Sequence, residues 1–255
     1  MGGVPTRPEL SVGPDDADAG SPADSDEGTL VVSEVFGPTF QGEGPSVGRR
    51  SGFVRLGRCN LDCAWCDTPY TWDTTRFDLR QERRRVPGGE LVAEVLDSAA
   101  DLVVVTGGEP LLQAEPLVPL VLTCRRDGRA VEIETNGTIT PPSALVAAGV
   151  RWNVSPKLAN SGIVRERRIR PEVLRAFADS AGAVFKFVVT RVADLDEIAD
   201  VVAEFGLGPV WVMPEGDSVD RMLPLLRQLA GDVLARGWNL TARLQVLVWD
   251  GERGR

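Results

Sequence analysis

Three cysteines close together in the sequence, Cys59, Cys63 and Cys66, have the spacing of a metal-binding site. They form a C-x3-C-x2-C pattern in which every side chain can supply a thiolate. A cubane iron–sulfur cluster needs one thiolate for each iron, so three thiolates leave the fourth iron open to another ligand. Because an open iron can react with a bound molecule, the spacing favours a reactive cluster over a purely structural one.

A zinc site or a disulfide fits the three cysteines less well. A zinc site usually has four ligands, and the chain contains no histidine to complete one. The fourth cysteine, Cys124, lies far along the chain beside two arginines, and a disulfide would leave one of the three cysteines unpaired. The lack of histidine also excludes Ser-His-Asp and Cys-His catalysis, so demanding chemistry must come from a cofactor or from Lys, Asp, Glu and Cys.

The length and composition suit one barrel-sized domain or two small ones. The chain has 255 residues, of which 43% are hydrophobic, as is ordinary for a globular core. No apolar run is long enough to cross a bilayer, and no secretory signal is visible at the N-terminus. Clustered thiols without an export signal fit a reducing cytoplasm, and we expect a cytoplasmic protein.

The formal charge of −9 is unevenly distributed along the chain. Residues 1–28 contain seven acids and one base, and therefore contribute −6 of this charge. Their richness in Gly, Pro, Ser and Asp predicts a disordered acidic tail over 1–28, followed by a catalytic domain over 29–255. The nearly balanced remainder offers no broad basic surface, so we expect neither nucleic acid nor a membrane as a partner.

Strand-like and helix-like patterns alternate after the tail. Strands are predicted over 30–36, 51–56, 102–105, 131–134, 151–154, 183–189, 210–213 and 244–248. Helices are predicted over 90–100, 111–126, 143–148, 171–178, 195–205 and 219–236. This alternation indicates an α/β fold with a parallel sheet, and both a doubly wound sheet and a barrel are compatible with it.

Polar or glycine-rich turns follow three of the predicted strands: Thr106–Pro110, Thr135–Thr138 and Ser155–Lys157. Ligands of parallel α/β folds collect at the carboxyl ends of the strands. Three such turns at equivalent places therefore predict one shared site.

The cysteine pattern, with Trp65 before its last cysteine, resembles the signature of the radical S-adenosylmethionine superfamily. The resemblance implies that the open iron binds S-adenosylmethionine and that the reduced cluster releases a 5′-deoxyadenosyl radical from it. Gly107 and Gly108 resemble the glycine-rich motif beside the methionyl end of the cofactor, where the backbone must approach a ligand closely. Glu109, in the same turn, is a weaker candidate to orient the amino group of the cofactor.

Six separated motifs from about Phe36 to Trp249 resemble one family within this superfamily, the 7-carboxy-7-deazaguanine synthases. In sequence order they are Phe40–Gly44, Arg55 before Cys59-Asn60-Leu61, Cys66–Thr68, Thr106–Pro110, Glu134–Thr138 and Ser155–Lys157. The resemblance implies conversion of 6-carboxy-5,6,7,8-tetrahydropterin to 7-carboxy-7-deazaguanine with loss of ammonia, in 7-deazapurine or queuosine-type biosynthesis. It also implies a modified partial (β/α) TIM-like barrel, a [4Fe–4S] cluster, S-adenosylmethionine, Mg²⁺, a homodimer and a reductase or flavodoxin-type electron donor.

The resemblance also assigns a role to individual residues. The expected metal ligands are Cys59, Cys63 and Cys66 for the cluster and Thr68 for magnesium. The expected contacts with S-adenosylmethionine are Trp65, Cys66, Asp67, Gly108, Ser155, Pro156 and Lys157. The expected pterin contacts are Phe40, Gln41, Gly42, Arg55 and Thr106. No side chain is assigned as a catalytic acid or base, and the guanidinium of Arg55 suits a bidentate grip on the substrate carboxylate.

Several of these residues also have a purely structural interpretation, and two alternative functions remain open. Phe40 could be a core aromatic, Thr68 a turn cap, and Arg55 an ion-pair partner. The chain departs from the family pattern at Gln245, where the family often has histidine, and continues through Asp250 to Arg255. The alternatives are an activase that makes a glycyl radical on a partner protein, or a non-catalytic iron–sulfur carrier with Cys124 as its fourth ligand.

Overall fold

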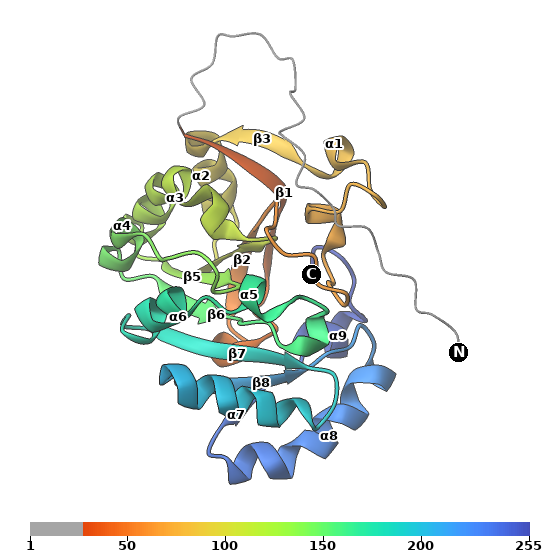
Figure 1. Cartoon of the computed structure of the whole chain (residues 1–255). Helices are drawn as coiled ribbons and strands as arrows, with labels where there is room; N and C mark the ends of the chain where they lie inside the picture. The colour runs from red at the N-terminus through yellow and green to blue at the C-terminus, as the bar shows by residue number, and fades with distance from the viewer. Residues whose placement is uncertain (1–27) are drawn as a thin grey trace.

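The computed structural model describes residues 28–255, which fold into a curved sheet with helices packed on it (Figure 1). The acidic tail predicted over 1–28 lies outside the described residues, apart from Gly28. The sheet has nine strands in the order β3-β1-β2-β4-β5-β6-β7-β8-β9. These strands are β1 (Thr29–Phe40), β2 (Arg50–Leu56), β3 (Arg84–Pro87), β4 (Leu102–Gly107), β5 (Ala130–Thr135), β6 (Arg151–Val154), β7 (Ala183–Val189), β8 (Val210–Pro214) and β9 (Asn239–Leu240).

The direction of the strands divides the sheet into two parts. β1 pairs antiparallel with both β2 and β3, whereas every pair from β2 to β9 is parallel. Within the described residues, β3 and β9 form the two edges of the sheet, so the barrel remains open. The structure thus confirms the predicted α/β class and the partial (β/α) TIM-like barrel.

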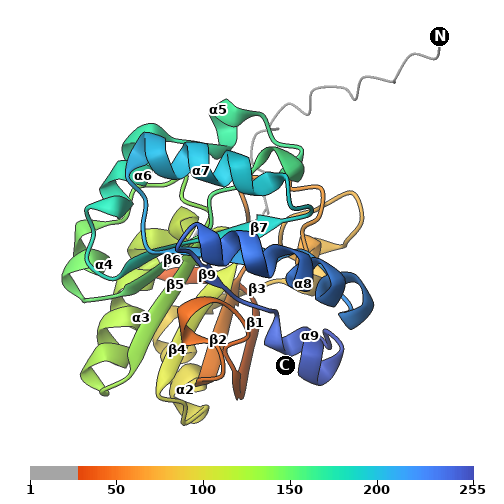
Figure 2. The ribbon, with the colours of Figure 1, turned by 90° about the horizontal axis from the view of Figure 1, so that it is seen from below.

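Helices follow the parallel strands as crossovers and cover one face of the sheet (Figures 1 and 2). The α-helices are α1 (Leu79–Glu82), α2 (Gly88–Asp97), α3 (Ala114–Arg126), α4 (Ser143–Ala147), α5 (Arg165–Arg168), α6 (Pro171–Ala178), α7 (Asp194–Phe205), α8 (Val219–Ala235) and α9 (Leu244–Trp249). Four short 3-10 helices are η1 (Gly44–Ser46), η2 (Pro69–Thr71), η3 (Pro110–Gln113) and η4 (Ala159–Ser161).

The main hydrophobic core lies between the sheet and these helices. Apolar strand residues such as Val105 and Phe187 are fully buried against helix residues such as Leu120 and Phe177. Trp152 on β6 packs edge-on against Phe177 of α6, with 5.4 Å between the ring centroids. This aromatic pair packs Trp152 firmly into the core.

The strand predicted over 244–248 is wrong, because these residues form α9. The run Leu244–Trp249 is short and apolar, and such a run does not distinguish a strand from a helix by its periodicity. The edge position next to β8 is taken instead by β9, which has two residues. In Figure 1, α9 lies near the orange segment that follows β2, on the opposite side of the sheet from α3 and α4.

The carboxyl ends of four neighbouring parallel strands meet at one edge of the sheet. Leu56 at the end of β2 lies beside Gly107 of β4, and Thr135 at the end of β5 lies beside Val154 of β6. The cysteine loop follows β2, and the three polar turns follow β4, β5 and β6. The topology therefore brings the three polar turns together, as predicted, and places the cysteine loop beside them. No helix within residues 28–255 has both the length and the apolar character of a membrane span.

Candidate functional site

One cavity at this edge of the sheet contains nearly all of the predicted site residues. It is lined by Cys59, Cys63 and Cys66, by the expected pterin contacts, and by the expected cofactor contacts other than Pro156. Pro156 is buried behind Ser155 and Lys157 and is not part of the lining, so its contact with a cofactor stays a prediction. Thr68 also lines the cavity, two residues after Cys66.

The cysteine loop is held against the β4 turn by backbone hydrogen bonds. The amide of Gly108 donates to the carbonyl of Leu56 at 3.1 Å, and the amide of Glu109 donates to the carbonyl of Arg58 at 2.9 Å. Arg58 has a φ of 73°, in the left-handed region that non-glycine residues rarely adopt. These contacts fix where the chain turns into the segment that carries the cysteines.

The two glycines of the β4 turn are required by this close approach of two chain segments. A Cβ on Gly107 would lie 2.1 Å from the carbonyl oxygen of Leu56, and one on Gly108 would lie 1.9 Å from that of Arg58. Gly107 also has a φ of 128°. The expectation that a ligand explains these glycines is therefore incomplete, since backbone packing beside Cys59 already requires them.

The carboxylate of Glu109 accepts three hydrogen bonds from groups of the protein. It accepts hydrogen bonds from the amides of Leu111 (2.9 Å) and Asn136 (2.7 Å) and from the hydroxyl of Thr135 (2.8 Å). Glu109 is completely buried and does not line the cavity. Its expected role in orienting a cofactor is thus not supported, and the side chain instead joins the ends of β4 and β5.

The three thiols suit a cluster better than a single metal ion. Cys63 is buried, Cys59 and Cys66 are half-buried, and all are free. Among residues 28–255, no three side chains of His, Cys, Asp or Glu are arranged to hold one metal ion. A cubane places each thiolate on a separate iron, so its cysteines stand further apart than the ligands of one zinc ion. The donor set therefore fits an iron–sulfur cluster.

The environment of the thiols changes the ease with which they lose their protons. Burial raises the pKa of the Cys59 thiol to about 12, because the charged thiolate is poorly solvated there. The indole Nε1 of Trp72 donates a hydrogen bond to Sγ of Cys66 at 3.3 Å. Bound iron would favour the thiolate form of Cys59, since a metal ion commonly deprotonates a coordinating thiol.

Cys124 is separated from this group. It is fully buried on α3 within the main hydrophobic core and does not line the cavity. The arrangement argues against the alternative in which Cys124 supplies a fourth ligand to the cluster.

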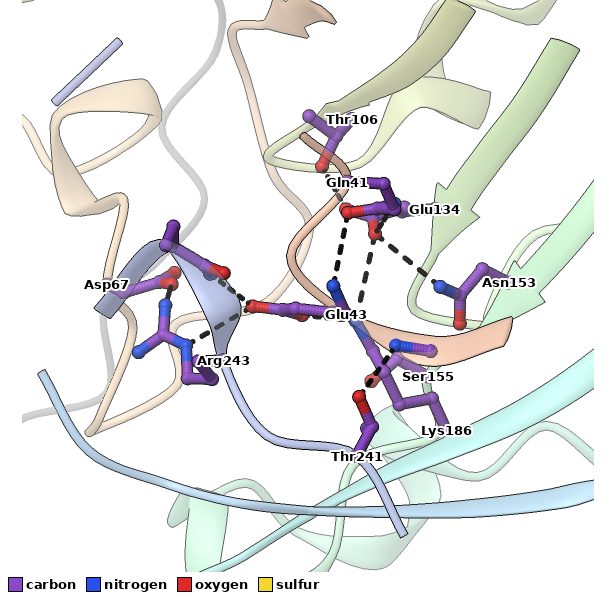
Figure 3. Close-up of polar contacts among 12 residues, drawn as sticks. Gln41, Glu43, Asp67, Thr106, Glu134, Asn153, Ser155, Lys186, Thr241 and Arg243 are labelled. Carbon is purple, nitrogen blue, oxygen red and sulfur yellow. Dashed lines mark hydrogen bonds and ion pairs between the residues drawn. The ribbon is translucent and has the colours of Figure 1, made fainter. Parts of the chain in front are cut away.

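A network of buried charged side chains crosses the deep end of the cavity (Figure 3). The carboxylate of Glu43 forms ion pairs with Lys186 and with Arg243, the latter at 3.2 Å. Lys186 also lies 3.7 Å from a carboxylate oxygen of Glu134, and Arg243 is paired with Asp67. The network joins β7, the segment after β1 and the cysteine loop.

Burial and charge have opposing effects on the pKa values in this network. Burial disfavours ionisation of Glu43, but the positive charges of Lys186 and Arg243 outweigh it and lower the pKa of Glu43. Burial likewise disfavours the charged form of Lys186, and the charges of Glu43 and Glu134 outweigh this effect and raise its pKa. Both groups therefore remain ionised at neutral pH.

Gln245 is linked to the same carboxylate. Its Nε2 donates to Glu43 at 2.8 Å, while its Oε1 is buried and has no hydrogen-bond partner within residues 28–255. The side chain also packs directly on Gly42, where an added Cβ would lie 1.7 Å from Oε1. Gln245 thus orients Glu43 and leaves one acceptor unused beside the cavity.

A second polar group connects the QGEG segment, residues 41–44, with β4 and β5. Nε2 of Gln41 donates to Glu132 at 3.0 Å and to Glu134 at 3.2 Å. The hydroxyl of Thr106 donates to the other oxygen of Glu134 at 2.7 Å, as Figure 3 shows. Because the hydroxyl hydrogen of Thr106 is used in this bond and a carboxylate only accepts, Thr106 and Glu134 present acceptor oxygens to the cavity.

Arg55 and Phe40 lie at other parts of the lining. Arg55 donates through Nε to Glu34 at 2.7 Å, and its guanidinium lies 5.5 Å from the ring centroid of Phe36. Phe40 stacks on Trp249 and remains 44% exposed, so it is not an ordinary core aromatic.

The expected cofactor contacts also depend on supporting residues. Nζ of Lys157 donates to Oγ of Ser155 at 3.0 Å and lies 5.6 Å from the Trp65 ring centroid. The Trp65 indole donates to Oδ1 of Asn160 at 3.1 Å, and the amide of Asn160 donates to Asp194 at 2.8 Å. Asp194, in the acidic first turn of α7, is buried and holds this chain of contacts in place.

Comparison with known proteins identifies the family. The model of the radical SAM superfamily matches residues 54–174. A 7-carboxy-7-deazaguanine synthase from Pyrobaculum aerophilum is 36% identical over 228 residues, which cover 88% of this chain and 96% of that protein. One from Rhodopirellula baltica is 34% identical over 96% of this chain and 97% of that protein. The chain belongs to the 7-carboxy-7-deazaguanine synthase family.

A solved structure supports the same family. The crystal structure of QueE from Escherichia coli matches with a TM-score of 0.66 and 25% identity, over 85% of this chain and 94% of that one. The chain is thus a radical SAM enzyme of deazapurine biosynthesis, as the sequence motifs predict. Membership of the superfamily implies a [4Fe–4S] cluster and S-adenosylmethionine, and the free thiols in the cavity fit this cluster.

The buried ion network is the part of this synthase-family site that sequence reasoning missed. One signal was present, since Lys186 is the only charged residue in the apolar run of β7. A lysine in a buried strand requires an acidic partner, which the QGEG segment supplies through Glu43. Arg243 has no comparable signal, because it precedes a run that is predicted as a strand and folds as α9.

Proposed function

We propose that this chain converts 6-carboxy-5,6,7,8-tetrahydropterin to 7-carboxy-7-deazaguanine with loss of ammonia. The main support is that residues from all six family motifs line a single cavity, in a chain 36% identical to a named synthase over 88% of its length. The product would enter queuosine-type or other 7-deazapurine biosynthesis.

We assign the cluster to Cys59, Cys63 and Cys66, and S-adenosylmethionine to Trp65, Cys66, Asp67, Gly108, Ser155, Pro156 and Lys157. Bound together, the reduced cluster and this cofactor supply a 5′-deoxyadenosyl radical. The chain itself contributes orientation. Lys157 is fixed by Ser155 at 3.0 Å, and Trp65 is fixed by Asn160 at 3.1 Å. Both side chains are therefore preorganised before a ligand enters.

We assign the pterin to Phe40, Gln41, Gly42, Arg55 and Thr106. The guanidinium of Arg55 uses only Nε within the described residues and can bind the substrate carboxylate through its two terminal nitrogens. The acceptor oxygens of Thr106 and Glu134 suit the N–H donors of a pterin ring. The aromatic ring of Phe40 offers a face for stacking at the cavity edge.

We assign Mg²⁺ to Thr68. Its hydroxyl lies 3.9 Å from Sγ of Cys66 and lines the cavity, so a cation bound there would lie between the cluster loop and a substrate. Mg²⁺ prefers oxygen ligands and keeps several waters, so one protein ligand with substrate oxygens is sufficient. We further propose a homodimer, a cytoplasmic location and a reductase or flavodoxin-type electron donor, as family membership suggests.

A turnover assay tests the proposed reaction. The protein is reconstituted anaerobically with iron and sulfide, reduced with dithionite, and incubated with S-adenosylmethionine, Mg²⁺ and the carboxypterin. We expect a product with the mass and ultraviolet absorbance of 7-carboxy-7-deazaguanine, and none from the Cys63→Ala variant. Wild-type protein with a full cluster that forms no deazapurine would overturn the proposal.

A further inference from the structure

A carboxylate on β1 connects Arg55 with the segment of residues 250–255. Oε2 of Glu34 accepts hydrogen bonds from Nε of Arg55 at 2.7 Å and from the hydroxyl of Tyr70 at 3.0 Å. Its other oxygen, Oε1, is paired with Nε of Arg253. Three donors from separate parts of the chain therefore converge on one partly buried carboxylate.

Arg253 is held in this position by two further contacts. Its Nη2 donates to Glu82 at 2.8 Å, and its guanidinium lies 3.8 Å from the centroid of the Tyr70 ring. In Figure 1 the blue C-terminal end lies beside the orange segment around η2 and α1, in agreement with these contacts. Arg255, in the same segment, lines the cavity together with Arg55. Residues 250–255 therefore border the part of the site assigned to the substrate carboxylate.

The way in which Glu34 is shared determines which atoms of Arg55 are available. A carboxylate commonly takes two parallel hydrogen bonds from one guanidinium. Here Arg55 gives only Nε to Oε2 of Glu34, and the second carboxylate oxygen is paired with Arg253. Within residues 28–255, the two terminal nitrogens of Arg55 have no hydrogen-bond partner.

We propose that Arg253 is a positioning residue: by occupying Oε1 of Glu34, it prevents a bidentate Arg55–Glu34 pair and keeps the terminal nitrogens of Arg55 available for the substrate carboxylate. Tyr70 supports this arrangement as a neutral donor. Burial raises the pKa of Tyr70 to about 12, although the positive charge of Arg55 acts in the opposite direction. The phenol therefore keeps its proton at neutral pH. The inference rests on the proposed function, because it needs a substrate that carries a carboxylate.

Arg253→Ala removes the ion pair, and Arg236→Ala is its matched control. Arg236 also pairs with an acid, Asp196 at 3.0 Å, and lies 5.7 Å from the centroid of an aromatic ring, that of Trp238. It does not line the cavity. Arg253→Lys retains the positive charge and should keep part of the wild-type affinity for a carboxylate ligand, because an ammonium can still pair with Glu34.

The readout is the binding of two pterins to reconstituted protein with S-adenosylmethionine. One is pterin-6-carboxylate and the other is pterin without the carboxylate. We expect Arg253→Ala to weaken binding of the carboxylate by about tenfold, the scale of lost charge-assisted hydrogen bonds, and to leave the other pterin unchanged. In turnover, KM for the carboxypterin should rise by a similar factor while kcat changes little.

A double-variant cycle with Glu34→Gln separates positioning from simple attachment of the segment. If Arg253 acts through Glu34, Arg253→Ala should have less than half of its effect on affinity in the Glu34→Gln background. The positioning role would be overturned if Arg253→Ala weakened binding of both pterins equally, or if its affinity for the carboxylate equalled that of Arg236→Ala. Turnover by the wild-type protein would still support the proposed function in either case. Wild-type protein that neither binds nor converts the carboxypterin would overturn both.

Discussion

Lys186 and Glu43, which are 143 positions apart in the sequence, form an ion pair in the interior of the protein. The side chain of Lys186 is 6% exposed and that of Glu43 is 14% exposed. The pair joins a central strand to the QGEG segment, which carries two of the residues assigned to the pterin, Gln41 and Gly42. The shape of this part of the cavity therefore depends on a contact between buried charges.

Removal of Lys186 should strongly destabilise the fold. Lys186→Met leaves Glu43 and Glu134 without a nearby ammonium, and breaking a buried ion pair from one side costs about 3–5 kcal/mol. The double variant Lys186→Met/Glu43→Gln removes both charges and should recover part of this loss. Anaerobic urea unfolding gives the free energies.

The exposed ion pair between Arg165 and Glu204 is the control for this experiment. Arg165→Met should cost less than about 1 kcal/mol, because both partners are largely solvated. Equal losses for Lys186→Met and Arg165→Met would show that the Lys186–Glu43 pair contributes little to stability.

The contribution of the same pair should depend on pH at both extremes. The pKa of Glu43 is lowered from 4.5, so its stabilisation is complete above that value and is lost as the pH falls. The pKa of Lys186 is raised from 10.5, so its stabilisation is complete below that value and is lost as the pH rises.

The difference in unfolding free energy between wild type and Lys186→Met/Glu43→Gln should therefore be constant from about pH 5.5 to about pH 9.5. Titration of other groups largely cancels in this difference. A steep change between pH 6 and pH 8 would contradict the assignment of both groups as ionised in the folded protein.

Gly108→Ala should disturb the cysteine loop, whereas Gly89→Ala should be tolerated. The new Cβ at position 108 would lie 1.9 Å from the carbonyl oxygen of Arg58 and 3.0 Å from Cβ of Cys59. At position 89, in the first turn of α2, no atom lies within 4 Å of the new Cβ, and alanine is the better helix former. We expect lower iron content and a lower Tm only for Gly108→Ala. Full cluster loading in that variant would show that the loop has room to move.

Thr68→Ala should separate magnesium dependence from cluster assembly. The variant retains all three cysteines, so iron content and cluster absorbance should equal those of wild type. Loss of the hydroxyl should raise the Mg²⁺ concentration needed for half-maximal turnover by about tenfold, the scale of one lost ligand contact. Identical magnesium titrations of the two proteins would remove Thr68 from the proposed ligands.

The sequence was a good guide where local patterns carry the information. The three strand-end turns predicted one site, because parallel strands place their carboxyl ends at a common edge. The alternation of strand-like and helix-like segments predicted the α/β class with a parallel sheet, and the family resemblance of the motifs predicted the partial barrel. These features depend on short-range spacing and on a general rule of topology, so no long-range contact had to be known in advance.

The sequence was a poor guide to contacts between distant segments. Neither the pairing of Arg243 with Asp67, 176 positions apart, nor that of Arg253 with Glu34, 219 positions apart, can be inferred from spacing. The apolar composition of the run 244–248 predicts a strand, although the segment folds as α9 with only Val246 buried. Tertiary packing decides such short segments.

We propose that Cys59, Cys63 and Cys66 hold a cluster with one open iron that binds S-adenosylmethionine. Electron paramagnetic resonance of the anaerobically reconstituted and reduced protein tests it most directly. We predict the signal of a reduced [4Fe–4S] cluster whose shape changes when S-adenosylmethionine is added. A cluster signal that is identical with and without S-adenosylmethionine would contradict the account.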